Sequence, residues 1–222
     1  MTFDRHPGYI DRGVSAIPEP PLGPWYICGL DLGQTMDFSA LAILELPSEH
    51  IRHLGRWELG TPYTKQVDDC RDLLHGSMLC GRTTLVVDAT GAGRPVIDMM
   101  RARGLSPVPI VITGGWAVQS TAGYISVPKR DLVAALAMGS EASVLVAPEL
   151  EYAPVLRREI ANFRAKITTS GHDTYEAWRE GQHDDLVLAA ALAIWWSRKA
   201  GHFTEADNMK VPRGKDWKAV RP

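Results

Sequence analysis

Three short apolar segments between residues 26 and 59 narrow the possible folds more than any other feature of this sequence. Each has the composition of a β-strand, and the loops between them are short enough for antiparallel pairing. Helices and strands then alternate, and the chain ends in helices. The predicted strands are Tyr26–Leu32, Ala40–Leu46, Ile51–Leu59, Thr84–Asp88, Val108–Ile112, Tyr124–Val127 and Ser143–Val146; the predicted helices are Tyr63–Cys80, Arg94–Arg103, Pro128–Met138, Glu149–Ile167 (broken or delayed by Pro154) and His183–Trp196. This βββαβαβ order predicts an α/β domain.

The length of 222 residues and the hydrophobic content of 45% suit one domain with a single good core. Proline and glycine are frequent in residues 1–24, which predicts an extended arm before the domain. Residues 25–200 carry the strand and helix patterns, and residues 201–222 form a basic tail. We therefore predict an arm, one domain and a tail.

Charge and cysteine content exclude some classes of protein. A formal charge of −2 gives no global attraction to nucleic acid, although it does not exclude a DNA partner. The three cysteines show no CxxC spacing, so neither a disulfide framework nor a zinc site is indicated. No segment has the length of a membrane span, and the polar N-terminus does not resemble a signal peptide. We expect a soluble, cytoplasmic protein.

Acidic residues border apolar segments at three places in the sequence. Asp31 lies in the first predicted strand, Asp88 ends the fourth, and Asp184 and Asp185 open an alanine-rich apolar helix. A lone carboxylate beside a core is costly, so three such positions indicate that a cation gathers them. The best candidate is a pair of divalent metal ions. Taken singly, each acid also has a structural explanation, as a satisfied strand acid, a turn or cap acid, or a favourable first-turn charge.

Four motifs give the chain a resemblance to a known family. They are Gly29–Ala40, Val86–Val96, Val127–Leu132 and His183–Leu186, and together they resemble the C-terminal nuclease domain of phage terminase large subunits, within the ribonuclease H-like superfamily. The resemblance covers about residues 25–197 and implies a mixed five-stranded or slightly larger sheet flanked by helices. It also implies that the first and fourth strands are neighbours, which would place Asp31 beside Asp88. The ATPase phosphate loop of a full large subunit, GxxxxGK[ST], is not found in this sequence.

The resemblance implies an endonuclease that cuts duplex DNA with little sequence preference during viral genome packaging. Two metal ions can stabilise the attacking hydroxide and the leaving oxygen of a phosphodiester, and hard Mg²⁺ or Mn²⁺ calls for oxygen ligands. By resemblance, Asp31 would bridge the two ions, Asp88 would bind one, and Asp184 or Asp185 the other. Which member of that pair binds metal is left open by the sequence. The terminase ATPase motor, the portal and the small terminase subunit would be partners.

Other residues near these motifs are candidates for DNA contact or for supporting roles. Lys129 and Arg130 begin a helix that the family places near its site, although a solvated face explains them nearly as well. His183 precedes the paired acids and would orient water or serve only as a helix-start residue. Asp37 follows the first strand and has a supporting role or simply closes a turn.

Three other functions compete with the nuclease. The segment Asp31–Thr35 also resembles the first phosphate loop of the actin, Hsp70 and sugar-kinase ATPases, but this chain is too short for their second lobe and lacks its glycine-rich loop. A Holliday-junction resolvase of the same superfamily is the nearest enzymatic alternative. A non-catalytic DNA-packaging module with vestigial acids would keep the same core.

Overall fold

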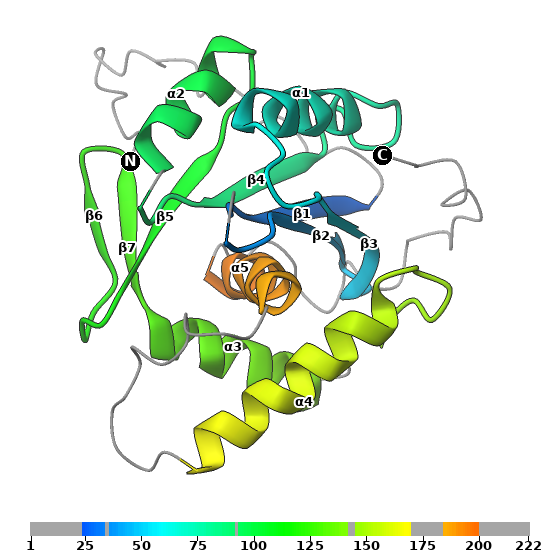
Figure 1. Ribbon diagram of the computed structural model, residues 1–222, viewed down its shortest axis with the longest axis vertical. Helices are drawn as coiled ribbons and strands as arrows, with labels where there is room; N and C mark the ends of the chain where they lie inside the picture. The colour runs from blue at the N-terminus through cyan, green and yellow to red at the C-terminus, as the bar shows by residue number, and fades with distance from the viewer. Residues whose placement is uncertain (1–23, 34–35, 92, 142–144, 170–183, 200–222) are drawn as a thin grey trace, which may run out of the picture.

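The computed structural model describes residues 24–33, 36–91, 93–141, 145–169 and 184–199. These residues form one mixed sheet with helices on both faces (Figure 1). The strands are β1 (Trp25–Asp31), β2 (Ala40–Leu46), β3 (His50–Arg56), β4 (Thr83–Asp88), β5 (Val108–Thr113), β6 (Gln119–Thr121), β7 (Tyr124–Pro128) and β8 (Leu145–Val146). The helices are α1 (Tyr63–Leu74), α2 (Gly93–Ala102), α3 (Lys129–Glu141), α4 (Ala153–Thr169) and α5 (Asp185–Lys199). The predicted α/β class is confirmed.

The eight-stranded sheet has the order β6-β7-β5-β4-β1-β2-β3-β8. The first three strands pair antiparallel, whereas β1 and β4 pair parallel, as do β4 and β5. The predicted neighbourhood of the first and fourth strands is therefore confirmed. The short strands β6 and β8 extend the two edges of a six-stranded centre, where the prediction was five strands or slightly more.

The sheet separates two apolar cores. Helix α5 lies on one face with α3 and α4 outside it, and α1 and α2 cover the opposite face (Figure 1). The alternation of side chains along each strand sends one half of β1 to each core: Ile27 packs with α5, whereas Cys28 and Leu30 pack with α1 and α2. Each residue of a central strand therefore has a known face.

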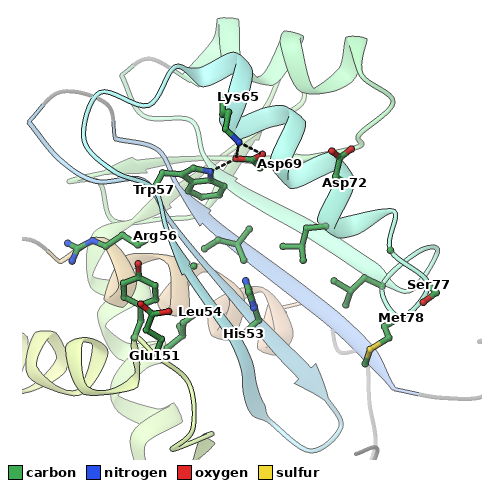
Figure 2. Close-up of a pocket in the computed structure, with 16 residues that line it drawn as sticks. His53, Leu54, Arg56, Trp57, Lys65, Asp69, Asp72, Ser77, Met78 and Glu151 are labelled. Atoms are coloured by element: carbon green, nitrogen blue, oxygen red, sulfur yellow. Dashed lines mark hydrogen bonds and ion pairs between the residues drawn. The ribbon is translucent and has the colours of Figure 1, made fainter. Parts of the chain in front are cut away.

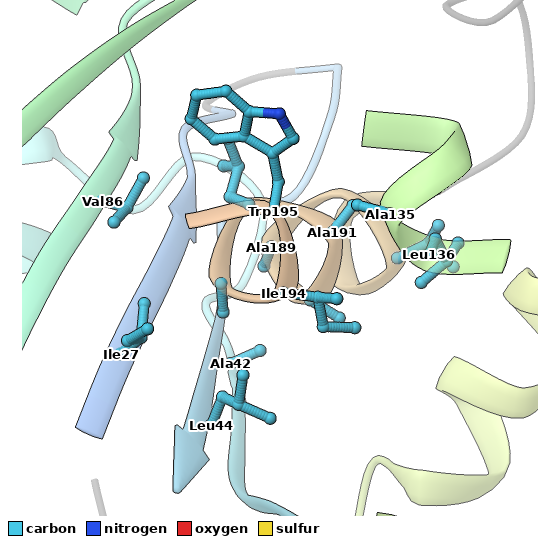
Figure 3. Close-up of a cluster of buried hydrophobic side chains, with 14 of the residues drawn as sticks. Ile27, Ala42, Leu44, Val86, Ala135, Leu136, Ala189, Ala191, Ile194 and Trp195 are labelled. Carbon is cyan, nitrogen blue, oxygen red and sulfur yellow. The ribbon is translucent and has the colours of Figure 1, made fainter. Parts of the chain in front are cut away.

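Helix α5 packs unusually close to the sheet because small residues meet at the contact. Figure 3 shows Ala189 of α5 in the same cluster as Ile27, Ala42 and Val86 of the strands, with Ala191 next to Ala135 of α3. A Cβ atom on Gly29 would lie 2.0 Å from the carbonyl oxygen of Ala189, so only glycine fits at this point of β1. The alanine-rich sequence of α5 and the glycine of β1 together bring two backbones into contact.

Two predictions of local structure were wrong, each for a local reason. Helix α1 ends at Leu74 rather than Cys80, because the chain turns at His75 and Gly76. The stretch predicted as irregular after Thr113 contains β6, which pairs with β7 in a hairpin. Of the two predicted effects of Pro154, a break or a late start, the late start is confirmed, because helix α4 begins at Ala153. The remaining predicted elements are present with ends that differ by a few residues.

Two further predictions concern regions at the ends of the chain. The proposed arm and the basic tail lie outside the described residues, so the division into arm, domain and tail remains a prediction.

The three cysteines are free, with Cys28 and Cys70 buried and Cys80 exposed. Among the helices of the described ranges, none combines the length and the apolar character needed to cross a bilayer.

Candidate active site

Asp31 and Asp88 are the last residues of two adjacent parallel strands. The register pairs Leu30 of β1 with Val87 of β4, so the next residues, Asp31 and Asp88, lie side by side. Their Cα atoms are separated by about one strand spacing, roughly 4.8 Å. Both side chains fall on the face of the sheet that α5 covers, because Gly29 and Val86, two residues earlier in each strand, contact α5 or its core. Two carboxylates thus meet at one edge of one face.

Asp88 and Asp31 belong to a row of paired residues that continues across the sheet to Arg56. Asp31 is opposite Ala40 of β2, and Ala40 is opposite Arg56 of β3. The row therefore runs from Asp88 through Asp31 and Ala40 to Arg56. Two acids and one arginine end three of these four neighbouring strands at the same edge, where Ala40 begins the fourth.

Asp185 reaches this edge from the first turn of α5. It is only 2% exposed, and its Oδ2 accepts a hydrogen bond of 2.5 Å from Nη2 of Arg56. Asp184 precedes the helix, is partly exposed, and accepts the amide hydrogen bond of Leu188 through its backbone carbonyl at 3.0 Å. Asp184 thus occupies the N-cap position, while the buried Asp185 carboxylate is tied to Arg56 at the end of the row.

Asp88 is also held by the turn that follows its strand. Its side chain is buried (5% exposed), and Oδ1 accepts a hydrogen bond of 2.8 Å from the amide of Thr90. The Oγ1 of Thr90 in turn accepts from the amide of Ile112 in β5 at 2.9 Å. Asp88 therefore accepts the turn hydrogen bond that was the structural alternative to metal binding. This hydrogen bond orients the carboxylate at the end of β4.

Asp31 is half-buried, and its negative charge affects the pKa of Tyr63, which belongs to the opposite face of the sheet. Burial raises the pKa of the Tyr63 phenol at the start of α1, and the Asp31 carboxylate raises it further. Asp37, in the loop after β1, is exposed. That loop is closed by Ser39, whose Oγ accepts from the amide of Gly33 at 3.0 Å and donates to the carbonyl of Gly33 at 2.6 Å.

Glu159 of α4 is a further acid at this site that the sequence reasoning missed. It is 7% exposed, and its Oε2 accepts a hydrogen bond of 3.1 Å from the amide of Val187 in the first turn of α5. Its Oε1 lies 3.8 Å from Nη2 of Arg56. Burial raises the pKa of Glu159 to about 7; the Val187 amide and Arg56 lower it, while Asp185 and Asp184 raise it.

A sequence signal for Glu159 does exist. Ala153 and Leu156 are buried on the inner face of α4, and Glu159 continues their three-residue spacing. Two arginines, Arg157 and Arg158, directly precede it, which makes the segment read as a solvated charged face. The helical spacing indicates burial, and the neighbouring charges conceal it.

Arg56 is therefore a largely buried cation between two buried acids. Its guanidinium carbon lies 3.8 Å from the centroid of the Phe38 ring, a cation–π distance. Within the part of the chain that the structure describes, its Nε has no hydrogen-bond partner. Sequence reasoning assigned Arg56 no role, because nothing local to β3 shows that α4 and α5 bring carboxylates to its side chain.

Two of the remaining candidates, Lys129 and Arg130, follow β7, which runs parallel to β5 and so ends at the same edge. Lys129 and Arg130 open α3 after β7, and the Arg130 guanidinium lies 4.4 Å from the centroid of the exposed Trp116 ring. Arg130 also hydrogen-bonds the carbonyl of Trp116 and lies 3.6 Å from Asp131. His183 lies outside the described residues, so its proposed role stays a prediction.

The carboxylates suit a hard divalent cation in type, burial and placement. Oxygen donors are gathered at one edge of one face, and a cation, Arg56, already lies against Asp185. Yet across the described ranges no group of three or more His, Cys, Asp or Glu side chains is close enough to hold a metal ion. A shared ion would therefore require side-chain movement, with Asp185 released from Arg56.

A separate pocket of about 590 Å³ lies beside β3 and is also lined by residues of α1, of the segment after α1 and of the segment before α4 (Figure 2). His53 and Trp57 of this strand region line it together with Asp69 of α1. The Trp57 indole donates to Asp69 at 3.0 Å, and Lys65 donates to the same carboxylate at 2.7 Å. Arg56 borders the pocket, but Asp31, Asp88 and Asp185 do not line it, so it is distinct from the acidic edge.

Solved structures with similar folds are nuclease domains of terminases. The large terminase nuclease from thermophilic phage G20c matches with a TM-score of 0.55 and 23% identity, over 79% of this chain and 82% of that one. The magnesium-bound form of the G20c nuclease gives a TM-score of 0.54 at 23% identity, covering 77% and 80% of the two chains. The large terminase nuclease domain of Thermus phage P74-26 gives 0.52 at 25% identity, covering 79% and 80%. No protein-family model and no curated protein sequence matches the chain. The chain has the ribonuclease H-like fold of the large terminase nuclease domains.

Proposed function

We propose that this chain is a metal-dependent endonuclease domain that hydrolyses phosphodiester bonds of duplex DNA, with little sequence preference, during viral genome packaging. One observation carries the proposal: Asp31 and Asp88 lie side by side on the face that α5 covers, and Asp185 enters the same edge through Arg56. Acids separated by more than 150 positions in the chain thus approach one site. A fold maintained for packing alone has no need of three carboxylates at one strand edge.

Divalent cations are the proposed cofactors, as two Mg²⁺ or Mn²⁺ ions. The similar G20c nuclease has been solved with magnesium and also with cobalt, which supports a divalent site here. When bound, such ions would generate the attacking hydroxide and stabilise the leaving oxygen. By resemblance, we assign Asp31 as the ligand that would serve both ions, Asp88 as a ligand of one, and Asp184 or Asp185 as a ligand of the other.

Other groups of the protein are proposed to orient these ligands or to contact the DNA. The Thr90 amide fixes one oxygen of Asp88 and so orients this carboxylate at the end of β4. Lys129 and Arg130, with His183 and Asp37, are proposed to contact the DNA strand or to support the ligands. The proposed partners are duplex DNA and, by resemblance, the ATPase motor, the portal and the small terminase subunit, in the host cytoplasm.

A plasmid-cleavage assay with Mn²⁺ tests the proposal. We expect nicking and linearisation by the wild-type chain, loss of both in Asp31→Ala, and no loss in Asp72→Ala. Asp72 is the matched control because it is an exposed acid on α1, away from the acidic edge. No cleavage with any divalent metal would refute the nuclease and favour a packaging module. Preference for four-way junctions over linear duplex would identify a resolvase instead.

A further inference from the structure

Arg56 contacts one buried acid closely and a second one loosely. Its Nη2 is 2.5 Å from Oδ2 of Asp185 and 3.8 Å from Oε1 of Glu159. All three side chains are largely buried, with 13%, 3% and 6% of their surfaces exposed. A buried guanidinium between two carboxylates has two acceptors available and forms a short hydrogen bond with only one of them.

The looser acid has an unused oxygen. Oε2 of Glu159 is fixed by the Val187 amide at 3.1 Å, whereas Oε1 accepts no hydrogen bond from any described residue. An unsatisfied carboxylate oxygen that is buried and close to a cation is a costly arrangement unless another state uses it. The Nε of Arg56 likewise has no hydrogen-bond partner among the described residues, so this donor is also unused.

We propose that Arg56 is a positioning residue that alternates between Asp185 and Glu159, so that it neutralises Asp185 in the metal-free protein and moves to Glu159 when a divalent cation binds. This inference rests on the proposed function, since it assigns the cation to the acids named above. A guanidinium and a divalent ion repel each other at one carboxylate, and Glu159 is the acceptor that lets the guanidinium remain buried. The Phe38 ring, 3.8 Å from the guanidinium carbon, can be retained in both positions because the required displacement is short.

Two substitutions should change the Mn²⁺ affinity in opposite directions. Arg56→Met removes the competitor at Asp185, so we expect about tenfold tighter binding. Glu159→Gln keeps an oxygen for the Val187 amide but removes the charge that attracts Arg56. The guanidinium then stays on Asp185, and we expect about tenfold weaker binding. A substitution that only loosened the structure would weaken Mn²⁺ binding in both variants.

The assay is calorimetric titration of each metal-free protein with Mn²⁺, without DNA, after melting curves have shown that each variant is folded. The matched controls are Arg52→Met and Glu45→Gln, because Arg52 and Glu45 form a comparable partly buried pair between β3 and β2 at 2.7 Å. Their Mn²⁺ affinity should equal that of the wild type. If Arg56→Met does not fold, Arg56→Gln, which also removes the positive charge, takes its place.

The two proposals fail in different ways. Shifts of equal sign in the two variants, or no shift in Glu159→Gln, would overturn the alternation of Arg56 while leaving the metal site standing. Absence of Mn²⁺ binding that depends on Asp31 and Asp88 in the wild-type protein would overturn the proposed function, and the role of Arg56 with it.

Discussion

A single added methyl group at Gly29 should separate α5 from the sheet. A Cβ atom there would lie 2.0 Å from the carbonyl oxygen of Ala189 and 2.9 Å from the amide nitrogen of Ala193. Both contacts are backbone atoms, so no rotamer change relieves them. A carbon and a carbonyl oxygen normally approach to about 3.3 Å, so in Gly29→Ala the helix must retreat by about 1 Å.

The cost of that retreat follows from what α5 covers. Most of the helix is buried against β1 and β2 and against α3, and a gap of about 1 Å forfeits up to half of each dispersion contact that it opens. We expect Gly29→Ala to lower the free energy of unfolding by about 3 kcal/mol, at the upper end of the overpacking range. For a chain of this size, that lowers Tm by roughly 6–12 °C.

Thermal unfolding followed by far-ultraviolet circular dichroism measures this effect. The control is Gly55→Ala in β3, where the nearest atoms to an added Cβ are His53 Nε2 at 3.4 Å and Leu41 Cβ at 4.0 Å. We expect that variant to stay within about 0.5 kcal/mol of the wild type. If the two variants melted within about 2 °C of each other, the close contact between α5 and β1 would not exist as described.

Three further predictions use the acids and cations of the edge. In Asp31→Asn, the Tm without metal should equal or exceed that of the wild type, because the repulsion between Asp31 and Asp88 is relieved. The rise in Tm that Mn²⁺ gives the wild-type protein should disappear in this variant. If the variant still gained stability from Mn²⁺, Asp31 would not be a ligand. The pKa of Glu159 is about 7 in the folded protein, above its ordinary value of 4.5, so its contribution favours folding below pH 4.5 and is lost as the pH rises through 7. The Tm of Glu159→Gln relative to wild type should therefore be higher at pH 8 than at pH 5, and an equal difference at both pH values would contradict the raised pKa. In Arg130→Ala, duplex binding should weaken and its salt dependence should fall by about one counterion, with Tm unchanged, whereas an unaltered salt slope would exclude a phosphate contact.

Local patterns in the amino-acid sequence predict much of the fold. The apolar runs of β1 and β4 and the alanine-rich sequence of α5 predict their elements directly, because each is a nearly continuous apolar segment of the right length with clear boundary residues. The neighbourhood of β1 and β4 was not readable from composition. It followed from the resemblance of four motifs, and the parallel register confirms it.

What the sequence could not predict depends on positive φ angles and on distant contacts. The β6–β7 hairpin turns at Ala122 and Gly123, which have φ values of 51° and 80°; alanine rarely adopts such an angle, so the usual Asn-Gly signal is missing. The link between Arg56 and Asp185 joins positions 129 residues apart, and no spacing rule indicates it. Glu159 was concealed by the arginines that precede it.

The same close contact that stabilises the fold also sets the position of the acid on α5. Gly29 lies two residues before Asp31 on β1, and the Ala189 backbone that it touches lies one helical turn after Asp185. The distance between Asp31 and Asp185 is thus fixed through one backbone contact, with no flexible side chain in between. A shift of α5 by about 1 Å would therefore move Asp185 relative to Arg56 as well as loosen the core, and a hydrogen bond of 2.5 Å does not tolerate such a change. Gly29→Ala should consequently alter Mn²⁺ binding even at temperatures where the variant is fully folded, and equal Mn²⁺ affinity in folded Gly29→Ala and wild type would show that the site adjusts independently of the helix.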